Sequence, residues 1–129
     1  MNYKNLEQKI ITSFTDGVTL SEAEQLAGEF LGAQIQISEE LKEESIRHRM
    51  LKADLKEIAA RLFYDEATKG EKKPSDSLLQ SIVDKDPGVK EATQKHLLSE
   101  ERANELYRLL NIFANAHLHF RSIAKGKFE

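Results

Sequence analysis

Apolar side chains recur at helical spacing along most of the chain, and the residues between them are mainly polar. Near the start the apolar positions fall three or four residues apart, which predicts a short helix over residues 3–14: Tyr3, Leu6, Ile10 and Phe14. The dipeptide Asp16-Gly17 interrupts the pattern, because glycine favours a helix end. The chain therefore begins with a helix and a turn.

A second and much longer helix is predicted over about residues 20–67. Thr19 and Glu22 have the spacing of a capping box, in which the hydroxyl accepts a backbone N–H and the Glu reaches back to the cap. No proline follows before Pro74. The helix can therefore continue without a break for more than forty residues.

Within residues 20–67 the apolar positions follow a seven-residue repeat. Its two core-facing positions read Ala27, Gln34, Leu41, His48, Leu55, Leu62 and Phe30, Ile37, Glu44, Leu51, Ile58, Asp65. Eight of these twelve residues are apolar. The pattern is that of an interrupted coiled-coil stripe.

Residues 68–75 combine Gly, Pro and several charges, which predicts a solvent-exposed loop. Ser75 can then cap a short connecting helix over about 76–84, and Asp86-Pro87 fits the cap and first position of a further helix. That last helix is predicted over about 87–125, with a second seven-residue repeat: Val89, His96, Ala103, Leu110, His117, Ala124 and Ala92, Ser99, Leu106, Phe113, Phe120. The fold class is all-α, and we treat 1–129 as one helical domain.

The long helix has an apolar stripe that the rest of a compact chain of this size cannot bury along its whole length. A straight helix of about 48 residues is about 72 Å long, whereas a compact chain of 129 residues is about 36 Å across. We therefore expect self-association, through Leu41, Leu51, Leu55, Ile58, Leu110 and Phe113. The alternative is a monomeric bundle in which the helix breaks near Gly28–Gly32. Gly28 and Gly32 lie inside the helical pattern, and close helix packing is their expected role.

The residue types argue against catalysis and against a metal site. The chain has no cysteine, and it lacks the nucleophile-elbow and the glycine-rich phosphate-binding motifs. His117 and His119 lie about 200° apart around a helix, so they cannot share a metal ion. Three histidines occupy repeat positions, namely His48, His96 and His117. We expect them to be packing residues, so a chelator should not change the thermal stability of the protein. We expect a non-enzymatic protein without metal or cofactor.

A phosphate-binding surface is the remaining chemical candidate. The net charge of −3 hides a basic middle, since residues 41–73 carry nine basic and seven acidic groups. Aromatic side chains among cations are typical of sequence-tolerant binding to single strands. The candidate DNA-binding residues are Lys56, Arg61, Tyr64, Lys69, Lys72 and Lys73. The alternative is an ordinary solvated helix face.

Over about residues 50–125 the chain resembles the bacteriophage UvsY recombination mediators. Those proteins have a Lys-Ala-Arg-Leu-x-Tyr segment at a helix end, a charged Gly-containing loop, a Leu-rich segment that closes on an Asp turn, and a final helix with a basic Arg-Ser motif. The corresponding stretches here are Ala60–Tyr64, Thr68–Lys73, Leu78–Val89 and Ala116–Lys125. The family's lysine falls on Ala59, and Lys56 and Lys69 are the nearest candidates to replace it.

This resemblance implies a small helical protein that forms a homo-oligomeric ring and binds single-stranded DNA. It also implies that the protein helps to load a RecA-like recombinase onto DNA covered by single-strand-binding protein. A helical scaffold, virion subunit or inhibitor of a host protein, without DNA binding, is the alternative. The N-terminus has no signal-peptide pattern and no apolar run is long enough for a membrane span. We therefore expect a cytoplasmic location, in the host if the protein is phage-encoded.

Overall fold

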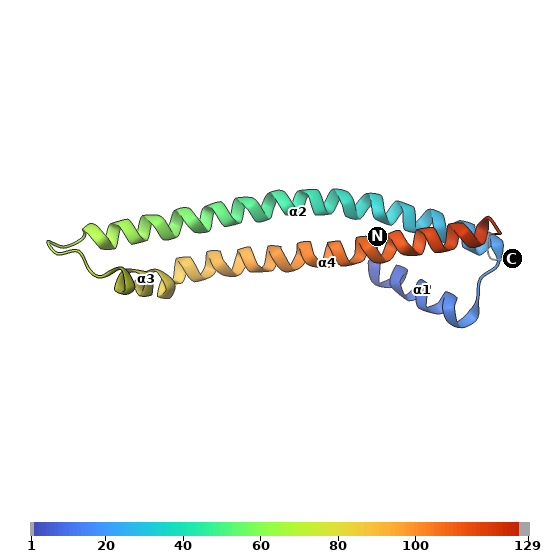
Figure 1. Cartoon of the computed structure of the whole chain (residues 1–129), viewed down its shortest axis with the longest axis horizontal. Coiled ribbons are helices and arrows are strands. Elements are labelled where there is room, and N and C mark those ends of the chain that lie inside the picture. Colours follow the sequence, from blue (N-terminus) through green and yellow to red (C-terminus); the bar gives the residue numbers. More distant parts are fainter. Residues whose placement is uncertain (1, 127–129) are drawn as a thin grey trace. The chain divides into compact units, whose positions relative to one another are not determined.

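The structure is a computed structural model and describes residues 2–126. Within this range there are four helices and no strand: α1 (Tyr3–Asp16), α2 (Leu20–Thr68), α3 (Asp76–Lys85) and α4 (Pro87–Ala124) (Figure 1). Helix covers 89% of the described residues. The predicted all-α class, with two long and two short helices, is confirmed. No helix in the described part of the chain is long and apolar enough to cross a membrane.

The helix ends are set by local hydrogen bonds that the sequence encodes. The backbone N–H of Glu22 donates to Thr19 Oγ1 at 3.1 Å, and the Thr19 hydroxyl donates to the Glu22 carboxylate at 3.0 Å. The carboxylate thus reaches back to the cap side chain. Ahead of it, α1 ends at Gly17, whose φ of 76° lies in the left-handed region that suits glycine.

The start of α3 and the start of α4 follow the predicted caps. The Leu78 N–H donates to Ser75 Oγ at 3.2 Å, and the Val89 N–H donates to Asp86 Oδ2 at 3.0 Å. Pro87 occupies the first position of α4, where a missing N–H leaves no hydrogen bond unmade. These caps separate α3 from α4 by a single residue, Asp86.

The chain divides into two compact units, and each long helix contributes to both. Unit 1 comprises Met1–Lys42 and Asn104–Glu129, and unit 2 comprises Glu43–Ala103. Unit 1 thus contains α1, the first part of α2 and the last part of α4. Unit 2 contains the rest of α2, the loop, α3 and the first part of α4.

In unit 1 three helical segments surround an aromatic core, and Figure 1 shows α1 beside the start of α2 and the end of α4. The Phe30 ring lies 5.3 Å from Phe113 and 5.6 Å from Phe120, and Tyr3 of α1 lies 6.0 Å from Phe113. The α2 and α4 segments run antiparallel here (Figure 1), and His117 Nδ1 donates to the Ala27 carbonyl at 2.9 Å. The buried apolar residues of the unit are Leu6, Ala23, Ala27, Phe30, Ala33, Ile37, Leu41, Leu106, Leu109, Phe113, Ala116 and Phe120.

Polar contacts on the surface of unit 1 tie α1 to both neighbours. Arg108 on α4 pairs with Glu7 at 3.0 Å and with Glu105 at 2.6 Å, and these hydrogen bonds hold the pKa of the guanidinium above its ordinary value. Lys9 pairs with Glu29 of α2 at 2.8 Å. Because these ion pairs are exposed, they orient α1 more than they stabilise it.

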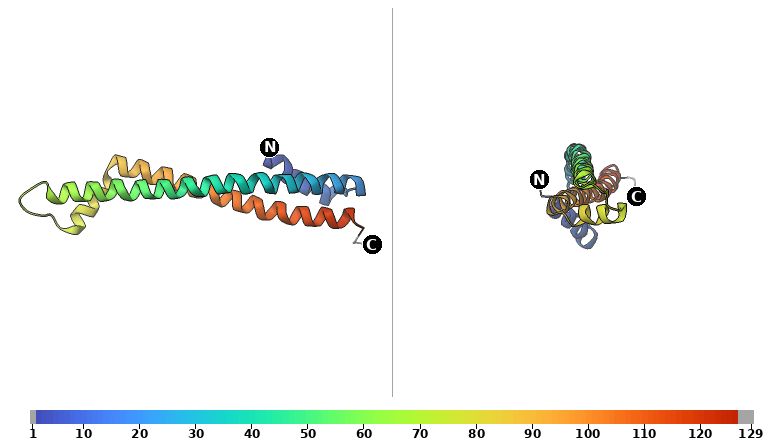
Figure 2. Two further views of the ribbon diagram at one scale, coloured as in Figure 1. Left: turned by 90° about the horizontal axis from the view of Figure 1, so that it is seen from above. Right: turned by 90° about the vertical axis from the view of Figure 1, so that its left-hand side faces the viewer.

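In unit 2 the packing is thinner. The end of α2, the helix α3 and the start of α4 lie together in two views (Figure 1, Figure 2). The buried residues here are Leu79, Val83, Val89 and Ser99. None of the α2 residues 43–68, all of which the structure describes, is buried. The Ser99 hydroxyl donates to the Glu44 carboxylate at 2.7 Å, which joins α4 to α2.

The continuous helix predicted over about residues 20–67 is confirmed: α2 runs without a break across Gly28–Gly32, so the alternative of a helix broken there does not occur. A Cβ added at Gly28 or Gly32 would meet open space, so within one chain these glycines do not serve the close helix packing expected of them. In each unit a segment of α4 packs along the segment of α2 (Figure 1), so the length of α2 alone does not require a second copy.

Candidate nucleic-acid interface

The six predicted DNA-binding residues all lie in unit 2, and all are exposed. Lys56, Arg61 and Tyr64 belong to the last turns of α2, and Lys69, Lys72 and Lys73 belong to the loop that follows. Tyr64 is 67% exposed, which is unusual for an aromatic side chain in a packed helix pair. The structure therefore gathers the predicted residues at the junction of α2 with the loop.

The helix places Tyr64 between two cations. Lys56 and Arg61 are five residues apart, so they project about 140° apart around the helix axis. Tyr64 projects about 80° from Lys56 and about 60° from Arg61. A strand that follows this surface would meet a cation on either side of the ring.

Three of these cations have acidic partners within the chain. Arg61 pairs with Glu57 at 2.8 Å, Lys69 with Glu66 at 3.9 Å, and Lys73 with Asp76 at 3.4 Å. The Arg61 and Glu57 side chains are 72% and 66% exposed, so water screens their attraction. A phosphate can therefore exchange for the carboxylate at little cost. Lys56 and Lys72 have no ion pair with any described residue.

An open groove of about 550 Å³ runs between the end of α2 and α3. It is lined by Ala59, Ala60, Phe63, Tyr64, Ala67, Lys73, Gln80 and Val83. Three alanines leave room beside the two aromatic rings, and Lys73 is the cation at its edge. A planar apolar group of the size of a nucleobase has a stacking partner here.

The residues predicted to join copies of the chain have different surroundings. Leu41 and Phe113 are 8% and 0% exposed inside unit 1, so contacts within one chain already account for their apolar character. Leu51, Leu55 and Leu110 are half-buried, and Ile58 is 41% exposed. Only these last four retain surface for a second copy.

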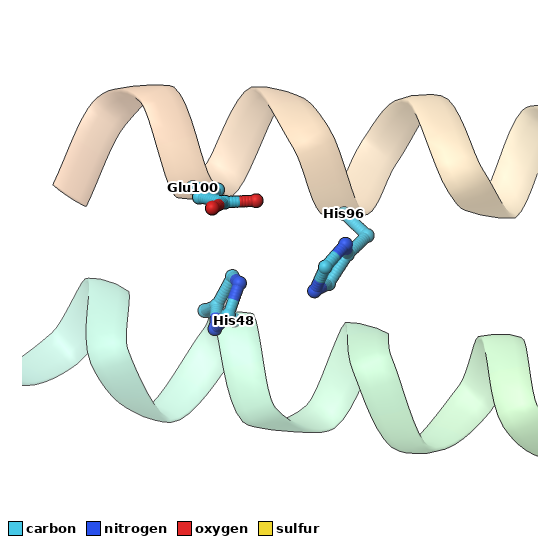
Figure 3. A group of neighbouring side chains, drawn as sticks. All are labelled: His48, His96 and Glu100. Carbon is cyan, nitrogen blue, oxygen red and sulfur yellow. The ribbon is translucent and has the colours of Figure 1, made fainter. Parts of the chain in front are cut away.

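A cluster of histidines that the sequence analysis assigned to packing lies in the same unit. The rings of His48 on α2 and His96 on α4 are stacked, with centroids 4.4 Å apart and an interplanar angle of 30°. Figure 3 shows Glu100, one turn further along α4, directed toward the same space. Ligand atoms of the three residues all lie within 4.8 Å of one another.

Nε2 of His48 and Nε2 of His96 are buried and have no hydrogen-bond partner among the described residues. Leaving a buried polar atom unpaired costs about 1–3 kcal/mol. Packing of the two rings thus leaves both nitrogens unpaired among the described residues, whereas His117 has its carbonyl partner. The spacing of four residues between His96 and Glu100 places both side chains on one face of α4, and this could be read from the sequence. Only the pairing of α2 with α4 brings His48 next to these two residues.

Comparison of the chain with protein-family models, with characterised proteins and with solved structures found no match.

Proposed function

We propose that the protein binds single-stranded DNA through the end of α2 and the loop that follows, without catalysing a reaction. The observation that carries this proposal is the exposed Tyr64 ring at the edge of an apolar groove, with Arg61, Lys69, Lys72 and Lys73 in the same segment. Aromatic rings that stack bases, framed by cations that contact phosphates, are the usual means of sequence-tolerant binding.

Charge arithmetic implies that one copy binds weakly. Residues 56–73 carry five basic and four acidic groups, and three of the cations are paired within the chain. Several copies in one assembly would add their contacts along a strand, which raises the overall affinity without any new contact. We therefore include self-association in the proposal, with Leu51, Leu55, Ile58 and Leu110 as its candidate contacts.

The biological role that fits this proposal is that of a recombination mediator. The resemblance to the UvsY mediators over about residues 50–125 supports it, because the resembling segments include Ala60–Tyr64 and the loop. In that role the assembly would load a RecA-like recombinase onto DNA covered by single-strand-binding protein, in the cytoplasm of the host cell. Neither a cofactor nor a metal ion takes part in this role.

The first test measures base stacking. Tyr64→Ala is expected to weaken binding of a fluorescent oligo(dT) by about 1–3 kcal/mol for each stacked base, with the salt dependence intact. Tyr107, on α4 in unit 1, is 53% exposed and supplies the matched control, Tyr107→Ala. Equal binding by wild type and the Tyr64 variant, with equal melting curves, would contradict the proposed site.

The second test measures phosphate contacts. The logarithm of the affinity for a single strand falls with the logarithm of salt by about 0.7 per phosphate neutralised. Titrations at about 50 and about 200 mM salt should give a shallower slope for Arg61→Ala, equally for dT and mixed sequences, because phosphates carry no sequence information. The exposed Arg102 on α4 provides the control Arg102→Ala.

A second function, that of a helical interaction protein without DNA binding, is favoured by one observation. Unit 2 exposes several large apolar side chains, namely Ile46, Met50, Ile58, Leu78, Leu97 and Leu98. Large apolar side chains that the chain leaves exposed are available for contact with another protein. Light scattering separates a monomer from an assembly, and retention of oligo(dT) at low salt separates the mediator from a scaffold or an inhibitor.

A further inference from the structure

We propose that His48, His96 and Glu100 form a binding site for one divalent transition-metal ion, with Zn²⁺ as the expected occupant. The three residues come from two helices: His48 from α2, and His96 and Glu100 from α4. In Figure 3 all three side chains are directed into the space between these helices. This site replaces the expectation that His48 and His96 serve only in packing, and it is independent of DNA binding.

The burial of the ring nitrogens is the first argument. His48 and His96 occupy repeat positions that an apolar residue would normally fill, and their Nε2 atoms are buried without a partner among the described residues. A neutral imidazole nitrogen in such surroundings is a ready metal ligand, because its lone pair is not engaged. One metal ion would satisfy both nitrogens together.

The second argument is the set of donors. Two imidazoles and one carboxylate form a known combination for zinc, in which a water or a substrate takes the fourth position. Glu100 has no ion pair with any described residue, and its exposure leaves a path for the ion from solvent. The donor set suits first-row transition metals better than Mg²⁺ or Ca²⁺, which prefer oxygen ligands alone.

The spacing of the donors is close to what coordination needs. Ligand atoms in a tetrahedral zinc site lie about 3.3 Å apart, since each lies about 2.0–2.1 Å from the metal. Here the three donor atoms lie within 4.8 Å of one another. The in-plane lone pairs of two stacked rings do not converge, so coordination requires the imidazoles to rotate about their side-chain bonds.

A metal at this position would link α2 to α4 where unit 2 has little other packing. The α2 residues 43–68 are all at least partly exposed, and the neighbouring cross-helix contact is the hydrogen bond from Ser99 to Glu44. A ligand that binds only the folded state shifts the equilibrium toward that state. The ion would therefore act as a structural clip.

The experiment uses the full chain, first treated with EDTA and then dialysed free of it. Titration with ZnCl₂ in a calorimeter is expected to give one bound ion per chain, together with a rise in melting temperature that EDTA reverses. Glu100→Gln should weaken zinc binding by more than about tenfold. Mutation of a residue that only hydrogen-bonds to a metal ligand already costs about tenfold or more in metal affinity, and Glu100 is proposed as a ligand itself. Glu101→Gln changes the adjacent exposed carboxylate and should bind as the wild type does.

His96→Leu tests the site without the risk of a trivial loss of structure. Leucine suits the repeat position, so the metal-free variant should melt no lower than the metal-free wild type, while the response to zinc disappears. Wild-type protein that shows neither heat nor a melting shift would overturn the proposal. Equal zinc affinity in the wild type, His96→Leu and Glu100→Gln would overturn it as well.

Cobalt gives a spectroscopic measure that needs no variant. Co²⁺ bound in a four-coordinate site with nitrogen ligands has strong visible absorption bands, which six-coordinate aqueous Co²⁺ lacks. We expect these bands to appear on addition of CoCl₂ and to vanish on addition of ZnCl₂. A spectrum identical to that of aqueous Co²⁺ at saturating protein would count against coordination by His48 and His96.

Discussion

Units 1 and 2 are built from parts of the same two long helices, yet they differ sharply in how much they bury. Twelve apolar residues of the described chain are buried in unit 1, and three are buried in unit 2. In unit 1 the 14-residue helix α1 packs as a third helix against the segments of α2 and α4. Three phenylalanines, Phe30, Phe113 and Phe120, fill the centre of this unit. Unit 2 has only the short α3 in that position.

The difference shows that a heptad pattern alone does not set the depth of a core. A pair of helices buries one narrow stripe on each partner, whereas a third helix widens the buried surface to positions beside the stripe. Ala33, Leu109 and Ala116 are buried in unit 1, although they lie outside the two repeat positions. The candidate binding residues, namely the histidine cluster, Tyr64 and the exposed cations around it, lie in the thinly packed unit 2.

The largest expected effect comes from removing an aromatic ring of unit 1. Phe113 is fully buried and contacts both Phe30 and Tyr3, so Phe113→Ala should lower the free energy of unfolding by about 3–5 kcal/mol. Phe14→Ala, at a ring that is 69% exposed, should lower it by less than about 1 kcal/mol. Urea denaturation followed by circular dichroism measures both. Similar losses in the two variants would show that unit 1 has no dominant core.

A smaller and more local effect is expected in unit 2. Leu79 of α3 is fully buried, whereas its neighbour Leu78 is 53% exposed. Leu79→Ala should cost about 2 kcal/mol, at the low end of the usual range, because the open surroundings can close over the gap. Hydrogen exchange should speed up in α3 and in the last turns of α2, and stay slow in unit 1. Leu78→Ala should change neither measurement, and faster exchange throughout unit 1 would contradict this separation of the units.

The cap of α3 supplies the third prediction. Ser75 Oγ accepts the Leu78 N–H, so Ser75→Ala should cost about 1 kcal/mol of helix stability. Ser77→Ala, at an exposed position inside the helix, should be neutral or slightly stabilising, because alanine has the higher helix propensity. Thermal melting of both variants measures the difference. If the Ser77 variant loses as much stability as the Ser75 variant, the cap is not what holds the start of α3.

The smallest expected effect is a gain of stability from a substitution in unit 1. Gly28 lies inside α2 with open space around its Cα, so Gly28→Ala should stabilise the fold by about 0.5–1 kcal/mol. Gly17→Ala is the opposite case, since a φ of 76° is strained for alanine and should cost about 1–2 kcal/mol. Melting temperatures should therefore move in opposite directions. A loss of stability in Gly28→Ala would reveal a contact at that face that one chain does not make.

The sequence by itself determined the helices and their ends. Periodic apolar residues and the caps at Thr19, Ser75 and Asp86 act over one or two helical turns, so they can be read without knowing the fold. For the same reason the exposed position of Tyr64 and the neighbouring lysines could be anticipated from a charged segment at a helix end. The DNA-binding role of those residues stays a prediction.

The tertiary structure alone decided which side chains meet across the helices. Residues 48 and 96 are separated by most of unit 2, and only the antiparallel pairing of α2 with α4 places their imidazoles 4.4 Å apart beside Glu100. It also decided that Phe113 and Leu41 are internal, and that Gly28 and Gly32 face open space. Periodicity identifies the apolar side of each helix. It does not identify which helix packs against that side, because any other helix with an apolar stripe can bury it.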